Sequence, residues 1–286
     1  MLVVAFAGQG SQRAGMGSTL FPRYRDVVNC ANRILGYSLQ DLCAAGGPRL
    51  TRTEFTQPAV FVVNKLLYED TLANDGIVPD VMIGHSLGEI NALHATGVLD
   101  FEEALQLVKA RGAFMAEHNG NGAMVALVGE RDQLLHEVST NESEVYVAND
   151  NSPRQIVVAG TKDGIKRLSQ RLSLQQAATV IPLAVSGPFH CPLMAGVDDR
   201  MGEYLEGCLL REPCIPVVSN YSAQPYRSDV MRTWLAKQVV STVRWLETIQ
   251  YLSGSGPLAV REIATSPVLT PLIEDCLKRM RESVMP

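Results

Sequence analysis

A serine between two glycines stands out in the stretch Gly84–Gly88, which reads Gly-His-Ser-Leu-Gly. The apolar segment 79–83 before it predicts a buried strand, and the segment 89–97 after it predicts a helix. Such a glycine-flanked turn lets strand and helix approach closely and projects the serine hydroxyl. The N–H of Leu87 then lies at a helix start, where it can stabilise an oxyanion. The pattern favours a nucleophilic Ser86, with a plain glycine-rich turn as the alternative.

A serine hydroxyl is a poor nucleophile without a base, and the sequence offers five histidines for that role. His85 adjoins the serine, so the strained turn aims it elsewhere, and His94 falls on the packed face of a predicted helix. His118 and His136 stand among polar residues, and we expect both to be solvated. His190 lies in a loop after a predicted strand, where catalytic groups gather. Elimination favours His190 and leaves the question open.

The overall composition excludes several classes of protein. Hydrophobic residues make up 46% of the 286 residues and charged residues 19%, which suits a globular chain and not a disordered one. A net charge of -5 disfavours a broad nucleic-acid-binding surface. Six scattered cysteines without a C-x-x-C pair predict reduced thiols, with neither a metal site nor a disulfide framework. The first twelve residues lack a basic region and nothing approaches a membrane span, so we expect a cytoplasmic protein that does not enter a membrane.

The order of predicted elements indicates an α/β protein of two domains. Hydrophobic periodicity predicts a strand over 2–7 and helices over 24–42, 59–73 and 101–117. After a glycine-rich tract at 118–122 the order becomes β-α-β-β-α-β, with strands at 123–129, 145–148, 155–158 and 179–185 and helices at 131–138 and 162–172. This order predicts a ferredoxin-like small subdomain at 122–186. It would be inserted into an α/β-hydrolase-like catalytic subdomain made of residues 1–121 and 187–286.

Seven motifs occur together and in order along the chain: GQGSQ at 8–12, TQPAV at 56–60, GHSLGE at 84–89, VKARG at 108–112, NDNSPRQIVVAG at 149–160, VSGPFH at 185–190 and VRW at 243–245. Together they resemble the malonyl-CoA:acyl carrier protein transacylases, over nearly the whole chain. The stretches at 36–47 and 55–64 are most similar to the discrete acyltransferases that serve polyketide synthases. Fatty-acid synthesis stays open as the other pathway.

The resemblance implies a role for each matching residue. Ser86 would be the nucleophile and His190 the base, with its imidazole oriented by the backbone carbonyl of Gln238 in place of a carboxylate. The backbone N–H groups of Gln9 and Leu87 would form the oxyanion hole. The resemblance thus implies a catalytic dyad and not a triad.

The resemblance also implies which acyl group the protein accepts. Arg111 matches the arginine that grips the free carboxylate of a malonyl group, a pairing that the bidentate guanidinium suits. An acetyl group would leave that buried charge unpaired. Phe189 matches the malonyl-preferring form, which crowds a methyl branch, and Gln57 matches a glutamine near the acyl pocket. We group His85 with these substrate-binding residues.

Three positions depart from the family's pattern. Ala7 replaces a usual proline, Pro188 stands where alanine is commoner, and residues 264–267 replace an expected glycine-proline turn. The last change bears on carrier recognition. Asn149 and Asn151 are predicted to belong to turns.

The implied activity is a ping-pong transfer of malonyl from coenzyme A, through a serine ester, to the phosphopantetheine thiol of an acyl carrier protein. Malonyl-CoA is the donor, and no metal or tightly bound cofactor is implied. We expect a monomer. The alternatives are another acyl unit such as methylmalonyl, an editing hydrolase, a non-catalytic scaffold that docks carrier proteins, and a general serine esterase, which would not need Arg111.

Overall fold

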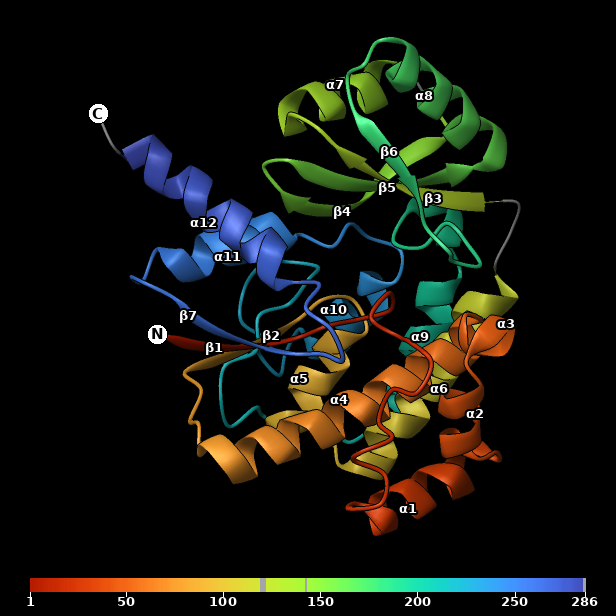
Figure 1. Cartoon of the computed structure of the whole chain (residues 1–286), viewed down its shortest axis with the longest axis vertical. Coiled ribbons are helices and arrows are strands. Elements are labelled where there is room, and N and C mark those ends of the chain that lie inside the picture. The colour runs from red at the N-terminus through yellow and green to blue at the C-terminus, as the bar shows by residue number, and fades with distance from the viewer. Residues whose placement is uncertain (119–121, 142, 285–286) are drawn as a thin grey trace.

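The computed structural model describes residues 1–118, 122–141 and 143–284. These residues form two β-sheets with helices packed on them (Figure 1). One sheet has three strands in the order β2-β1-β7, and the other has four in the order β4-β5-β3-β6. Figure 1 shows the four-stranded sheet at the upper end of the molecule, with α7 and α8 beyond it, while the N-terminus lies in the lower body.

The three-stranded sheet is parallel and has its first strand in the middle. β1 (Leu2–Phe6) pairs with β2 (Val81–Gly84) on one side and with β7 (Ala259–Ile263) on the other. Alternate side chains of β1 enter two different apolar clusters, because successive side chains of a strand point to opposite faces. Helices cover both faces, and this burial explains the unbroken apolar run of the first strand.

The helices on the two faces come from different parts of the chain. α4 (Thr53–Asp75), α5 (Gly88–Ala95) and α6 (Phe101–Glu117) pack with Val4 and Phe6, whereas α11 (Trp245–Ser253) and α12 (Thr270–Val284) pack with Val3 and Ala5. α6 has its predicted bounds, and the Asp100–Glu103 capping box fixes its start.

Two helices near the N-terminus have bounds that differ from the predicted ones. The single helix expected over 24–42 is two helices, α1 (Arg25–Leu35) and α2 (Leu39–Ala45), because Gly36 adopts a left-handed conformation at φ +82° and ends the first. A short α3 (Gly47–Leu50) follows. α4 begins at Thr53, before the expected residue 59, and it accommodates Pro58 close to its start.

The antiparallel sheet is built by one continuous stretch of chain. Its elements are β3 (Gly122–Val128), α7 (Arg131–Asn141), β4 (Val145–Ser152), β5 (Gln155–Thr161), α8 (Lys162–Leu174) and β6 (Thr179–Pro182). Their order is the one predicted, although β6 is shorter than expected. The prediction of turns at Asn149 and Asn151 was wrong, because both lie within β4, at shifts in its pairing with β5. Of the glycine-rich tract at 118–122, residues 119–121 lie outside the described part, so the predicted boundary at 121 does too.

A segment before α11 pairs with the antiparallel sheet. The N–H of Val243 donates to the carbonyl of Ala148 at 2.9 Å, and the N–H of Asp150 donates to the carbonyl of Val243 at 3.0 Å. The hydroxyl of Thr242 adds a bond to the carbonyl of Val147. β4 is therefore hydrogen-bonded to the segment that leads into α11.

The remaining elements carry the chain from the histidine loop to that segment. They are the 3-10 turn η1 (Pro192–Met194), α9 (Val197–Glu206) and α10 (Met231–Gln238). No helix in the ranges that the structure describes has the length and apolar character needed to cross a membrane.

Candidate active site

Ser86 stands at a tight turn between β2 and α5, with φ at +53°, a conformation that non-glycine residues adopt only under constraint. The neighbouring glycines allow the turn. A Cβ on Gly84 would lie 2.0 Å from the carbonyl carbon of Gly88, and a Cβ on Gly88 would lie 2.1 Å from the carbonyl oxygen of Phe6. Any side chain at either position would push the helix away from the sheet.

Ser86 and His190 meet at this turn although 104 residues separate them. The Oγ of Ser86 lies 2.6 Å from the Nε2 of His190, and the Nδ1 of His190 lies 2.8 Å from the backbone carbonyl oxygen of Gln238. Because a carbonyl can only accept, Nδ1 carries the hydrogen and Nε2 is left as the acceptor for the serine proton. The structure therefore brings together the three residues of the expected dyad and its orienting carbonyl.

The imidazole of His190 is buried and neutral. Burial, and next the positive charge of Arg111, lower its pKa from the usual value to about 3. A neutral ring with a free Nε2 can accept a proton throughout the physiological pH range.

Arg111 lies on α6 with only 1% of its surface exposed. Its Nη1 donates to the side-chain oxygen of Gln57 at 2.7 Å, and its Nη2 donates to that of Gln238 at 2.9 Å and to Ser86 Oγ at 3.1 Å. Burial lowers the pKa of the guanidinium to about 10, and the negative charge of Glu89 raises it, so the group stays protonated. A buried cation held by neutral oxygens next to the nucleophile is suited to receive an anion.

Close packing of α6 on α4 brings Arg111 to this place. A Cβ on Gly112 would lie 3.3 Å from the Cα of Glu54, so the two helices approach closely at this level. Gln57, on the facing side of α4, thereby reaches the guanidinium. Its amide nitrogen also donates to the Sδ of Met115.

The backbone segments of Gln9 and Leu87 are neighbours. Leu87 is the N-cap of α5, and Gln9 lies in the turn after β1. A Cβ on Gly8 would lie 2.3 Å from the carbonyl oxygen of His85 and 3.5 Å from the nitrogen of Leu87, so the turn packs directly on the serine loop. The side chain of Gln9 donates to the hydroxyl of Thr53, which hydrogen-bonds to Ser186 in the histidine loop.

The remaining predicted residues have other immediate contacts. The Nε2 of His85 lies 2.9 Å from the side-chain oxygen of Asn151, and its ring packs on Trp245 at 5.2 Å between centroids. This agrees with the expectation that the turn aims His85 away from the serine. Phe189 is buried in the main core cluster. Roles for His85 and Phe189 in substrate binding stay predictions.

The other histidines lie apart from the serine. His94 packs against Phe61 and Phe101 and its Nδ1 contacts the carbonyl oxygen of Leu99, which is the structural role expected of it. His118 and His136 are exposed, as predicted.

Sequence reasoning missed a buried polar group behind the serine. Asn220 and Glu89 are both fully buried and lie next to the turn. Burial raises the pKa of Glu89 to about 7, while hydrogen bonds from Tyr226 and Asn220 lower it. Glu89 is the last residue of the GHSLGE motif, so the sequence did carry a signal for it. Asn220 has no local sequence signal, since the partners of its side chain and of its backbone N–H lie more than 130 residues away.

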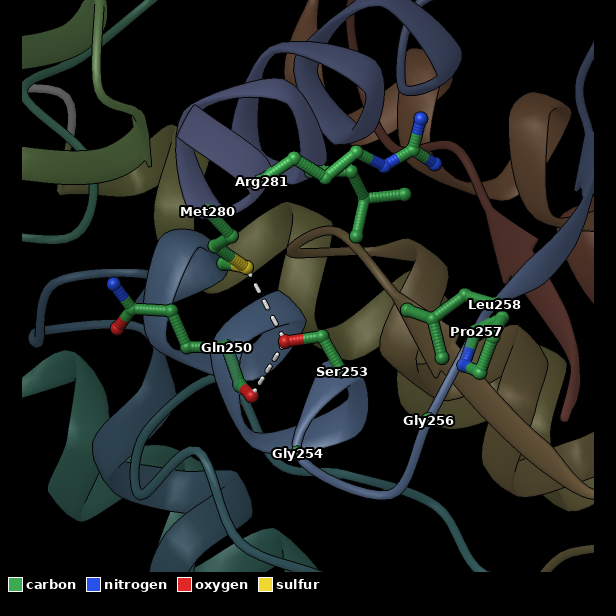
Figure 2. A pocket seen from close by; sticks show the side chains of 9 residues that line it. Gln250, Ser253, Gly254, Gly256, Pro257, Leu258, Met280 and Arg281 are labelled. Carbon is green, nitrogen blue, oxygen red and sulfur yellow. Dashed lines mark hydrogen bonds between the residues drawn. The ribbon is translucent and has the colours of Figure 1, made fainter. Parts of the chain in front are cut away.

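One pocket lies beside the histidine loop, and another lies between α11, β7 and α12. One of about 480 Å³ is lined by Arg52, Glu54, Ala113, Ala116, Glu117 and Ser186, beside the histidine loop. Another of about 720 Å³ lies between the end of α11, the start of β7 and α12; Figure 2 shows the hydroxyl of Ser253 bonded there to the carbonyl of Gln250 and to Met280. None of the predicted site residues lines either pocket. The described residues contain no cluster of acidic, histidine or cysteine side chains that could hold a metal ion.

Comparison with known proteins agrees with this geometry. Residues 3–285 match the model of the acyl transferase domain family, so the chain is an acyltransferase. The chain is 39% identical over 277 residues to the polyketide biosynthesis malonyl CoA-acyl carrier protein transacylase PksC of Bacillus subtilis, covering 96% of each protein. It therefore belongs to the family of malonyl CoA-acyl carrier protein transacylases.

Solved structures give the same result. The malonyl CoA-acyl carrier protein transacylase of Burkholderia pseudomallei superposes with a TM-score of 0.92 at 37% identity, with 98% of each chain covered. A malonyl-transacylase solved in complex with a type II polyketide synthase acyl-carrier protein gives a TM-score of 0.88 at 35% identity, over 97% of this chain and 93% of that one.

Proposed function

We propose that this enzyme transfers a malonyl group from coenzyme A, through an ester on Ser86, to the phosphopantetheine thiol of an acyl carrier protein in polyketide biosynthesis. The observation that carries the proposal is the buried guanidinium of Arg111, 3.1 Å from the Ser86 oxygen and bonded to neutral amides. A malonyl carboxylate would give this guanidinium a hydrogen-bonded anion in place of neutral oxygens. The name of the Bacillus relative supports the polyketide context.

The first half-reaction forms the ester. Ser86 Oγ attacks the thioester carbonyl while its proton passes to His190 Nε2, 2.6 Å away. The N–H groups of Gln9 and Leu87 bind the oxyanion of the tetrahedral intermediate. The C–S bond then breaks, and the coenzyme A sulfur leaves with the proton that His190 returns.

The second half-reaction runs the same steps with a new thiol. The carrier thiol gives its proton to His190 and attacks the malonyl ester, and the C–O bond to Ser86 breaks as His190 protonates Oγ. The carbonyl of Gln238 keeps the imidazole in one tautomer through both halves, because it accepts from Nδ1 throughout.

Substrate selection follows from the pairing of charges. The guanidinium would exchange the bonds that its Nη2 makes to Ser86 and Gln238 for bonds to the malonyl carboxylate. That exchange also frees the serine oxygen from a donated hydrogen bond. Phe189, next to the base in the chain, would limit branching at the malonyl α-carbon, and Gln57 would hold Arg111 in line.

The organisation of the molecule is part of the proposal. We assign residues 1–121 and 187–286 to an α/β-hydrolase-like catalytic subdomain and 122–186 to a ferredoxin-like subdomain; the parallel and antiparallel sheets support this division. The enzyme acts as a cytoplasmic monomer without a tightly bound cofactor. Its six cysteines, all within the described residues and all unpaired, suit a reducing compartment.

The test is intact-protein mass spectrometry after brief exposure to an equal mixture of malonyl-, methylmalonyl- and acetyl-CoA, followed by addition of a holo-carrier protein. We expect a malonyl adduct that is absent in Ser86→Ala, present in the exposed-serine control Ser139→Ala, and transferred to the carrier. A methylmalonyl or acetyl adduct would contradict the assigned acyl group. Release of free coenzyme A without an adduct would indicate a hydrolase, and no reaction at all would indicate a scaffold.

A further inference from the structure

The segment that precedes Asn220 runs beside β2 as a partial extra strand. The N–H of Met82 donates to the carbonyl of Pro216 at 2.9 Å, and the N–H of Val218 donates to the carbonyl of Met82 at 3.3 Å, in a parallel bridge between Met82 and Val217. A regular ladder cannot continue past Gly84, because the chain turns there into the left-handed Ser86.

The side chain of Asn220 continues the ladder where the backbone cannot. Its Nδ2 donates to the carbonyl of Gly84 at 2.7 Å, and its Oδ1 accepts from the N–H of Ser86 at 2.7 Å. One primary amide thus binds the peptide groups on both sides of His85. It offers one donor and one acceptor in a fixed plane, as a peptide group of a neighbouring strand would.

The amide is itself held from two directions. The backbone N–H of Asn220 donates to Glu89 Oε2 at 2.6 Å, and its backbone carbonyl accepts from the N–H of Arg244 at 3.0 Å. The other oxygen of Glu89 accepts from the hydroxyl of Tyr226. Glu89 lies in the first turn of α5, so the helix that follows Ser86 also anchors the amide that binds Ser86.

We propose that Asn220 is a positioning residue for catalysis: its amide holds the strained serine turn so that Ser86 Oγ and the N–H of Leu87 keep their places relative to His190. A side chain of the same size that lacks either the donor or the acceptor leaves a buried peptide group next to His85 without this hydrogen bond. The turn then relaxes toward an ordinary conformation, and the oxygen moves away from Nε2. The inference rests on the proposed acyl transfer through Ser86.

The decisive pair of variants is Asn220→Asp and Asn220→Leu. In Asn220→Asp, the ionised carboxylate can accept from Ser86 N–H but cannot donate to the carbonyl of Gly84, whereas the protonated carboxyl restores both bonds. The Leu side chain restores neither at any pH. The buried groups around the new carboxyl are Glu89, Tyr226 and, through Ser86, His190 and Arg111; dividing by the wild-type rate at each pH cancels the titrations that both proteins share.

We would measure malonyl transfer to a holo-carrier protein at pH values from about 5 to about 8, the range in which a buried carboxyl titrates. For Asn220→Leu we expect kcat to fall about 100-fold, the usual effect of a misplacement near 1 Å, while KM for malonyl-CoA changes less than about threefold. For Asn220→Asp we expect the rate relative to wild type to rise as the pH falls. Asn91→Leu is the matched control, because Asn91 is also buried in α5 and its amide bonds to the carbonyl of Phe61 and the side chain of Asn64, not to the serine turn.

Provided that the wild-type enzyme is active, either of two results would overturn the proposal. One is a relative rate for Asn220→Asp that does not change with pH, and the other is a loss in Asn220→Leu no larger than in Asn91→Leu at equal folded fraction by circular dichroism. A wild-type protein that forms no malonyl ester on Ser86 would instead contradict the proposed function itself.

Discussion

Replacing Arg111 by alanine should change which acyl group the enzyme accepts. Arg111 is 1% exposed, and the three hydrogen bonds of its guanidinium go to Gln57, Gln238 and Ser86. A malonyl carboxylate brought into this site is paired by Arg111, and without Arg111 it becomes a buried charge with no partner. We therefore expect Arg111→Ala to lose malonyl transfer selectively.

The magnitude follows from the burial of the pair. Removing one partner of a buried, hydrogen-bonded ion pair costs about 3–5 kcal/mol. This cost corresponds to a fall in kcat/KM for malonyl-CoA of about 10²- to 10⁴-fold. Acetyl-CoA has no carboxylate, so its kcat/KM should change less than about tenfold, because Arg111→Ala also removes the unpaired cation that opposes it.

The assay is stopped-flow formation of the acyl-enzyme with each thioester, compared as a ratio of the two kcat/KM values. Arg211→Ala serves as control, since Arg211 pairs with Glu103 at the surface and should leave the ratio unchanged. Arg111→Lys keeps the charge but not the fork, and its ratio should fall between those of the wild type and Arg111→Ala. An equal loss for malonyl- and acetyl-CoA would refute the reasoning, because it would mean that Arg111 maintains the fold of the site and does not select the substrate.

Three further outcomes are expected. Because Arg111 lowers the pKa of His190, Arg111→Ala should raise that pKa. With acetyl-CoA as donor, the acid limb of the pH–rate profile for acyl-enzyme formation should then move to higher pH. An acid limb that does not move would show that Arg111 does not act on the base. The pKa of Glu89 in the fold, about 7, lies above its ordinary value of 4.5, so folding favours its protonated form and stability is lost as the pH rises from about 4.5 through 7. Glu89→Gln should escape this loss of stability, which amounts to at most about 3 kcal/mol. The difference in melting temperature between Glu89→Gln and the wild type should therefore increase from about pH 4.5 to about pH 7 and then level off. A difference that does not change with pH would contradict the assignment. Gln57→Glu places an internal carboxylate on Arg111 and should raise the KM for malonyl-CoA about tenfold or more by competing with the substrate, whereas an unchanged KM in steady-state kinetics would argue against direct contact of the substrate with Arg111.

The sequence predicted best what depends on residues close together in the chain. The serine turn follows from two glycines four positions apart, and the bounds of α6 follow from its periodicity. The break at Gly36 was missed, because the apolar spacing continues across it into the next helix. Periodicity alone does not record where a left-handed residue interrupts a helix.

The candidate site divides in the same way. Ser86 could be chosen from its own surroundings, whereas His190 needed elimination, and Arg111 and Gln238 were assigned by resemblance to the family. Asn220 could not be predicted, because its role depends on a segment folding back beside β2 after more than 130 residues. Hydrogen bonds of that sequence separation leave no local pattern.

The bonds between β4 and the segment around Val243 have a consequence for engineering. Asn151 of the same strand binds His85, next to the nucleophile, so the antiparallel sheet is seated on the catalytic turn as well as on the chain before α11. A chimera that transplants residues 122–186 from a related enzyme imports one half of each of these bonds and keeps the other half from the host. We expect functional exchange only when residues 241–245 travel with the graft, and activity in chimeras made with and without that segment would measure how far the two sheets have adapted to each other.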